Sequence, residues 1–191
     1  MSSWLKISYF ARNLNYCIKY KKMKQKHIQQ ILAVLPNNIT LVDEKIDYLD
    51  YQTIAIEKNI TALDAYKIMT SHQPKWLELL FKIRDFLVRL VGIKPVHGFN
   101  NPEQQHHNLE TSNTLHFFTI IEQTEDKLTL QVKDSHLDVC LCLRIVNNTE
   151  KTNMLYLIAS VNNHNFWGKL YMMPVSVLHP FVVRQLFHNF K

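Results

Sequence analysis

The chain has 191 residues, of which 47% are hydrophobic and 20% are charged, a composition typical of one folded domain and not of a disordered chain. The formal net charge is +6, but seven of the 22 basic residues precede Asp43, the first acidic residue. Residues 43–191 therefore hold 15 basic against 16 acidic side chains. This nearly neutral balance argues against the strongly basic surface of a nucleic-acid-binding protein.

The cysteines and the lack of long apolar runs indicate the compartment. The chain has three cysteines, Cys17, Cys140 and Cys142, and the last two are too close in an extended strand for an unstrained disulfide. Free thiols suit a reducing environment. Charged and amide residues interrupt the N-terminal segment, unlike a signal peptide, and no apolar run is long enough to span a membrane. We therefore expect a cytoplasmic protein.

Residues 1–35 are expected to form a basic, helical N-terminal extension, followed by a single domain over residues 36–191. Apolar residues recur at helical spacing in the first part of this extension, with basic residues between them. They are Trp4, Ile7, Ala11, Leu14 and Ile18. Three interpretations stay open for residues 1–22: a helix that contacts an anionic membrane surface, a loosely held extension, or a segment upstream of a translation start at Met23.

The next part of the chain predicts a short helix, a strand and a second helix. The short helix spans residues 23–34 and ends at a Leu-Pro-Asn-Asn turn. The β-branched and aromatic residues of 46–56 predict a strand. Thr61 and Asp64 form a pattern like a capping box, which indicates a helix over residues 62–70.

A longer helix is predicted to begin near Pro74 and to end at Gly92, where glycine favours a left-handed cap. Its apolar residues fall on one face. They are Trp76, Leu79, Leu80, Ile83, Phe86, Leu87 and Leu90. The following polar segment, residues 94–114, contains three histidines, and we interpret it as a solvated loop or as a lid over a pocket.

From residue 115 onward the apolar residues alternate, which predicts strands. The predicted strands span residues 115–123, 127–133, 137–147, 153–162 and 166–173. Short polar connections indicate antiparallel neighbours. A last helix is expected after Pro174, with Pro180 near its first turn and an apolar stripe. The stripe comprises Val183, Leu186, Phe187 and Phe190. This order predicts an α+β fold in which a curved antiparallel sheet of about six strands wraps helices.

The segment KDSHLDVCLCLRI, residues 133–145, concentrates residue types that carry chemistry. In a strand, successive side chains point to opposite faces. Asp138, Cys140, Cys142 and Arg144 therefore share the face opposite the leucines. We interpret this face as the wet side of a half-buried strand.

A second interpretation treats the start of this segment as a catalytic centre. His136 can act as an acid or base near neutral pH, with Asp134 or Asp138 as its partner. A metal site is not expected, because the spacing of these residues matches no recognised zinc pattern. No cofactor-binding fingerprint is present either.

Three segments together resemble a bacterial family, domain of unknown function 2867. They are PKWLELLFKIRDFLVRLVGI (74–93), KDSHLDVCLCLRI (133–145) and NHNFWGKLYMMPVSVLHPFVVRQLF (163–187). The matching residues are Asp134, His136, Leu137 and Asp138, followed by Asn165, Gly168, Lys169, Tyr171 and His179. The chain departs from the family pattern at Val177 and Leu178, which stand where the family has Pro-Phe. The resemblance implies a helix-grip, or START-like, fold with a cavity between the sheet and the last helix.

Three functions remain open. The favoured one is a non-enzymatic binder of a lipophilic small molecule. The pocket of such a protein combines an apolar lining with a few polar groups. The candidate polar ligand contacts are Arg84, Arg144, His164 and Tyr171. The alternatives are an enzyme that uses the His136 acid/base pair and a peripheral interaction module that uses the basic N-terminal helix. The oligomeric state is left open.

Overall fold

The computed structural model describes residues 24–42, 45–72, 74–79, 82, 114–149 and 151–190. The chain divides into two units at Leu35 and Pro36, and each is described by itself. In the first unit, residues 24–32 are helical, close to the predicted bounds. The N-terminal amphipathic segment, the helix end at Gly92 and most of the polar loop that follows it lie outside the described residues.

The second unit contains a six-stranded antiparallel sheet in the order β1-β6-β5-β4-β3-β2. The strands are β1 (Tyr48–Glu57), β2 (Thr114–Leu115), β3 (Phe118–Gln123), β4 (Lys127–Lys133), β5 (Leu137–Asn147) and β6 (Thr152–Asn163). Strands β3 to β6 follow one another through short turns, and β6 then pairs with β1. The predicted α+β class and its curved antiparallel sheet are confirmed.

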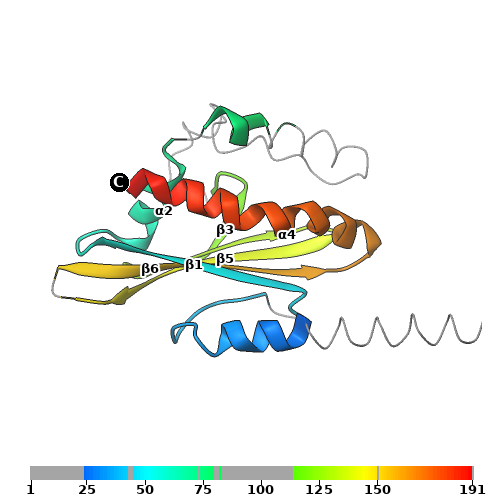
Figure 1. Ribbon diagram of the computed structural model, residues 1–191, viewed down its shortest axis with the longest axis horizontal. Coiled ribbons are helices and arrows are strands. Elements are labelled where there is room, and N and C mark those ends of the chain that lie inside the picture. The colour runs from blue at the N-terminus through cyan, green and yellow to red at the C-terminus, as the bar shows by residue number, and fades with distance from the viewer. Residues whose placement is uncertain are drawn as a thin grey trace, which may run out of the picture. The chain divides into compact units, whose positions relative to one another are not determined.

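The helices α2 (Ala62–Thr70) and α4 (Phe166–Phe187) lie on one face of this sheet (Figure 1). Helix α2 contacts β4 and β5, whereas α4 contacts β1 and β6. The short 3-10 helix η1 (His188–Phe190) follows α4. Thr61 caps α2 by accepting a hydrogen bond from the Asp64 backbone N–H at 3.1 Å, as predicted. None of the described helices combines the length and apolarity that a bilayer span requires.

The main hydrophobic core lies between the sheet and the two helices. Alternate residues of three neighbouring strands supply it, because every second side chain points to the same face. These include Leu128 and Leu130 of β4, Leu143 and Ile145 of β5, and Leu155 and Leu157 of β6. Helix α4 contributes Val183, Leu186 and Phe187, and Phe190 packs against them. The predicted terminal stripe is therefore confirmed.

The opposite face of β5 differs from the prediction. Cys140 and Cys142 share a face, as alternation requires, but they are 1% and 0% exposed. Residues 38–42 cover this face. The Thr40 carbonyl accepts a hydrogen bond from the Cys140 thiol of β5 at 3.6 Å. The Val42 N–H donates to Ser160 Oγ of the neighbouring β6 at 3.0 Å. The expected wet face is wrong for these cysteines because a second layer of chain excludes water.

The predicted strand 115–123 is two strands joined by a tight turn. Thr114–Leu115 pairs with Phe118–Thr119, and His116 occupies the turn with φ of 56°. A left-handed conformation is uncommon for a residue other than glycine. Apolar residues continue through this turn and it contains no glycine, proline, asparagine or aspartate, so the residue types give no sign of it.

The predicted strand 166–173 is wrong, because these residues form the first turns of α4. Asn165 caps the helix, which runs through both Pro174 and Pro180 instead of starting after the first. Pro174 and Leu170, four residues earlier, are both exposed, so the carbonyl that loses its hydrogen-bond donor to the proline ring lies on the solvent-facing side of the helix, where this loss costs least. The expectation that Pro180 lies in a first turn is also wrong, because α4 already begins at Phe166.

Candidate functional site

The first cluster lies where the turn between β4 and β5 meets the start of α4. The Asn165 side-chain oxygen accepts hydrogen bonds from the backbone N–H groups of Trp167 at 3.0 Å and Gly168 at 3.2 Å. Its amide donates to the Ser135 carbonyl at 3.1 Å and lies 2.9 Å from Nδ1 of His136. Such a cap satisfies backbone donors that a helix leaves unpaired. The His136 ring thus contacts a helix cap.

The His136 backbone also fixes the approach of α4. Its carbonyl accepts a hydrogen bond from the His164 N–H at 2.9 Å. A β carbon on Gly168 would clash with the same carbonyl oxygen. Glycine is therefore required at this position for the helix to come this close to the turn.

The two aspartates of the predicted catalytic group have separate partners. Asp134 Oδ1 accepts a hydrogen bond from the His136 backbone N–H at 3.2 Å. Asp138 Oδ2 lies 3.2 Å from Nε2 of His164. Among the described residues, the His136 ring pairs with the Asn165 amide and with neither carboxylate. In the part of the chain that the structure describes, no three His, Cys, Asp or Glu side chains converge on a site for a metal ion.

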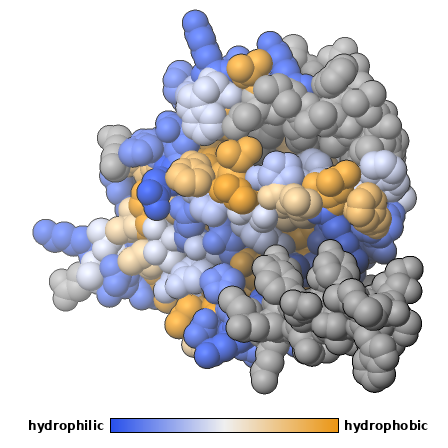
Figure 2. Space-filling model, turned by 45° about the vertical axis from the view of Figure 1, so that its right-hand side comes forward, coloured by the Kyte–Doolittle hydropathy of each residue, from blue (hydrophilic) through white to orange (hydrophobic). Residues whose placement is uncertain are grey.

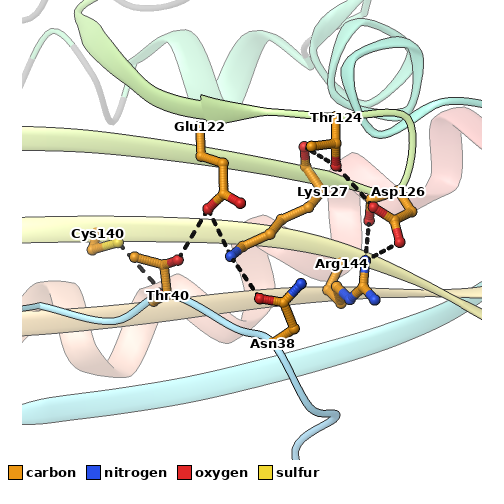
Figure 3. Close-up of polar contacts among 8 residues, drawn as sticks. All are labelled: Asn38, Thr40, Glu122, Thr124, Asp126, Lys127, Cys140 and Arg144. Atoms are coloured by element: carbon orange, nitrogen blue, oxygen red, sulfur yellow. Dashed lines mark hydrogen bonds and ion pairs between the residues drawn. The ribbon is translucent and has the colours of Figure 1, made fainter.

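The covered face of the sheet carries a buried cation. Lys127 is 3% exposed, and its Nζ lies 2.7 Å from Oε2 of Glu122. It also donates to Asn38 Oδ1 at 3.4 Å, while Thr40 Oγ1 donates to the same Glu122 oxygen at 3.4 Å (Figure 3). Polar groups from β3 and from residues 38–42, which we call the covering segment, therefore neutralise and position this lysine.

Arg144 lies beside this lysine and forms an ion pair with Asp126 (Figure 3). Two hydrogen bonds lower the pKa of the Asp126 carboxyl: the larger effect comes from Thr124 and the next from Arg144. Burial raises the pKa of the nearby Cys142 thiol, so Cys142 is a poor nucleophile at neutral pH. The predicted ligand contact Arg144 is thus engaged in an ion pair on the face opposite the helices.

The second cluster joins β1 to the middle of α4. His179 Nδ1 lies 3.2 Å from Oδ2 of Asp50. Two residues further along β1, Gln52 donates from Nε2 to the Pro180 carbonyl at 2.7 Å. The Asp50 and His179 side chains remain 23% and 21% exposed. This cluster is therefore polar, held to the helix on one side, and accessible to solvent.

Tyr48 lies beside this pair, two residues before Asp50 on the same face of β1. Its ring stands edge-on to His179, with ring centroids 6.0 Å apart. Its hydroxyl is buried and has no hydrogen-bond partner within the described structure. Burial, and secondarily the Asp50 charge, raises the pKa of Tyr48 well above its ordinary value. The hydroxyl therefore stays protonated and can donate a hydrogen bond.

The surroundings of Tyr48 are apolar. The ring packs against a hydrophobic cluster between β1, β5, β6 and the first half of α4. The cluster contains Leu137, Val139, Val161, Tyr171, Met172 and Val175. Of the predicted ligand contacts, Tyr171 lies in this cluster.

Both clusters fall within residues 43–186, which match the family model described as protein of unknown function (DUF2867). The chain belongs to this family. No curated protein and no solved structure matches the chain. In this DUF2867 domain, the residues that suggested the resemblance lie in two different regions. Residues 134–136 form the turn before β5, whereas His179 belongs to the cluster beside Tyr48.

The structure brings few of the predicted site residues of this DUF2867 protein together. Arg84 lies outside the described residues. Arg144, His164 and Tyr171 contact three different regions. Sequence reasoning missed Tyr48 and Asp50, which stand two residues apart on the helix-facing side of β1. Together with Gln52, their polar groups interrupt the apolar residues of that face, and this was the signal that the sequence offered.

Proposed function

We propose that this protein binds a lipophilic small molecule between the sheet and α4, beside Tyr48, without catalysing a reaction. The observation that carries the proposal is the buried Tyr48 hydroxyl, which has no hydrogen-bond partner among the residues that the structure describes. Leaving such a group unsatisfied costs about 1–3 kcal/mol. A ligand with a carbonyl or carboxylate oxygen would accept its hydrogen bond and remove this cost.

The chemistry around Tyr48 supports an apolar ligand with one polar end. Tyr171, Met172 and Val175 of α4 supply apolar and polarisable surface, which suits an aliphatic or aromatic ligand body. The partly exposed Asp50–His179 pair offers a polar boundary next to the hydroxyl. Binding sites of this kind place a few directional groups at the end of an apolar lining.

The alternative of acid/base catalysis by His136 has less support. The His136 ring pairs with the Asn165 amide, and the two aspartates pair with other groups. An acid/base catalyst must reach the proton of its substrate. The contacts of His136 instead fit a role in joining the β4–β5 turn to α4.

A solvatochromic ketone tests the proposal. The probe is 6-propionyl-2-dimethylaminonaphthalene, which has an apolar body and a carbonyl acceptor and fluoresces at shorter wavelengths in apolar surroundings. We expect saturable binding by the full chain and weaker binding by Tyr48→Phe, by roughly 3- to 10-fold for one lost hydrogen bond. Tyr51→Phe is the matched control, since Tyr51 pairs with Ile158 on the opposite face of the sheet.

The two variants separate binding from folding. Tyr48→Phe removes a hydroxyl that none of the described residues pairs with, so the free energy of unfolding of this variant should equal or exceed that of the parent chain. Equal probe affinity in the parent and Tyr48→Phe would contradict the proposed site. A parent chain that binds neither this ketone nor any co-purified molecule seen by native mass spectrometry would contradict the function.

A further inference from the structure

The outward side of α4 is apolar along almost its whole length. Large apolar side chains recur on it every three or four residues, and each is at least 41% exposed. They are Phe166, Trp167, Leu170, Met173, Val177, Leu178 and Phe181. We call this set the outer stripe. The buried residues of the helix, among them Gly168, Met172 and Val183, lie on the opposite side.

The outer stripe is unusual for a water-facing helix. Phe166, Met173, Val177 and Phe181 are 62–68% exposed, and in Figure 2 a band of hydrophobic side chains crosses the coloured surface. Scattered apolar residues on a surface need no explanation, whereas a contiguous patch marks an interaction site. The length and continuity of the stripe therefore indicate a surface that becomes covered.

The charges of α4 favour an anionic partner. The helix contains no acidic residue. Its exposed charges are Lys169, beside the first residues of the outer stripe, and Arg184, just beyond its last residue. Long basic side chains of this kind keep their charged ends in the headgroup layer while their stems lie against apolar surface.

We propose that the outer stripe of α4 docks on an anionic lipid bilayer, with α4 lying parallel to the membrane surface. Helices that bind in this way bury aromatic and aliphatic residues at the boundary between headgroups and acyl chains and place basic residues beside them. Phe166, Trp167 and Phe181 supply the aromatic residues. The apolar residues give the depth of insertion, and Lys169 and Arg184 give the preference for anionic lipid.

The same charges disfavour pairing of two copies through α4. An antiparallel pair brings Lys169 of one copy toward Arg184 of the other, and a parallel pair brings identical cations together, so both arrangements place like charges close to each other. The N-terminal part of this chain is equally unsuited to cover the stripe by charge, since it has seven basic and no acidic residues before Asp43. Binding to an anionic lipid surface brings no like charges together.

The test is flotation of the full-length protein with vesicles of phosphatidylcholine alone and with 30% phosphatidylglycerol. We expect binding to the anionic vesicles and at least about tenfold weaker partitioning of the variant Leu170→Gln, Met173→Gln, Val177→Gln, which removes three exposed apolar groups. The matched control is Ile121→Gln, because Ile121 is also 53% exposed but lies in β3. The control should bind like the parent.

Further variants test the contact of the outer stripe with lipid independently of the triple variant. Trp167→Phe should lose most of the blue shift of tryptophan fluorescence on anionic vesicles, because this ring enters the headgroup layer. A second set, Phe166→Gln with Phe181→Gln, should weaken partitioning in the same direction. All these positions are exposed, so circular dichroism should give unchanged melting curves. Unchanged flotation of both sets would assign binding to the basic N-terminal residues and overturn the proposal.

Two other results would also overturn it. If light scattering finds a dimer that the triple variant converts to a monomer, the stripe covers a second copy. If the stripe variants lose capture of a protein but not of lipid, the partner is a protein. The proposal is independent of ligand binding at Tyr48: Tyr48→Phe should float like the parent, and the triple variant should keep its affinity for the ketone.

Discussion

Gly168 determines how closely the first turn of α4 approaches the β4–β5 turn. The His136 carbonyl oxygen occupies the space of a side chain at this position, and the same carbonyl accepts the His164 N–H at 2.9 Å. Because both the obstacle and its hydrogen bond belong to backbone, the conflict cannot be relieved by rotating a side chain.

Gly168→Ala is therefore expected to lower the free energy of unfolding by about 1–3 kcal/mol, the typical cost of forcing extra atoms into a packed site. Urea denaturation followed by circular dichroism measures it. The neighbouring Lys169→Ala changes an exposed residue and should stay within about 0.5 kcal/mol. An alanine at 168 as stable as the parent would mean that the helix is not held against the turn.

The sequence indicated that residues able to carry acid/base chemistry gather at this turn, but it did not indicate which contacts they make. Asp134, His136 and Asp138 form a pattern that suits acid/base chemistry, and alternation placed Asp138 correctly on the face opposite the leucines. The partners of His136 and Asp138 are Asn165 and His164, which lie 29 and 26 positions later and meet them only when α4 starts at residue 166. Reading that stretch as a strand concealed the cap.

At the scale of elements, α4 combines two apolar faces with two internal prolines. Apolar residues on both sides weaken a helical period, and prolines normally end a helix. These two features explain why the sequence indicated a strand followed by a shorter helix. The one local signal for the correct start was Asn165, a favoured N-cap residue. In contrast, α2 has one buried face and a capping residue, and its bounds agree with the prediction.

The covering segment and the β3–β4 pair are linked by the buried Lys127. Glu122→Gln leaves the ammonium group without its carboxylate partner, and we expect a loss of about 1–3 kcal/mol in the free energy of unfolding, less than for a fully buried pair because Glu122 is 39% exposed. Lys127→Met with Glu122→Gln should recover part of that loss, since no charge remains buried.

Urea denaturation of the single and double variants measures this coupling. Glu125→Gln is the matched control, because Glu125 is an exposed residue on the neighbouring turn, and its effect should stay within about 0.5 kcal/mol. Additive effects of the Lys127 and Glu122 substitutions would show that the two side chains do not interact energetically.

At the scale of the whole molecule, the sheet is buried on both faces in its centre. Helices α2 and α4 cover one face, and residues 38–42 cover part of the other. The sequence predicted the antiparallel sheet because the short polar turns allow no crossovers. It did not predict the second layer, because residues 38–42 contain no regular period and are recognised only through contacts with distant strands.

The central claim is that a small molecule binds beside Tyr48, whereas the histidine–aspartate turn is structural. Amide chemical shifts of the full-length, nitrogen-15-labelled protein, recorded during titration with the naphthalene ketone, test this most directly. We predict saturable changes that concentrate at Tyr48, Asp50, Tyr171 and His179. Changes concentrated at residues 134–138, or no saturable change at all, would contradict the account.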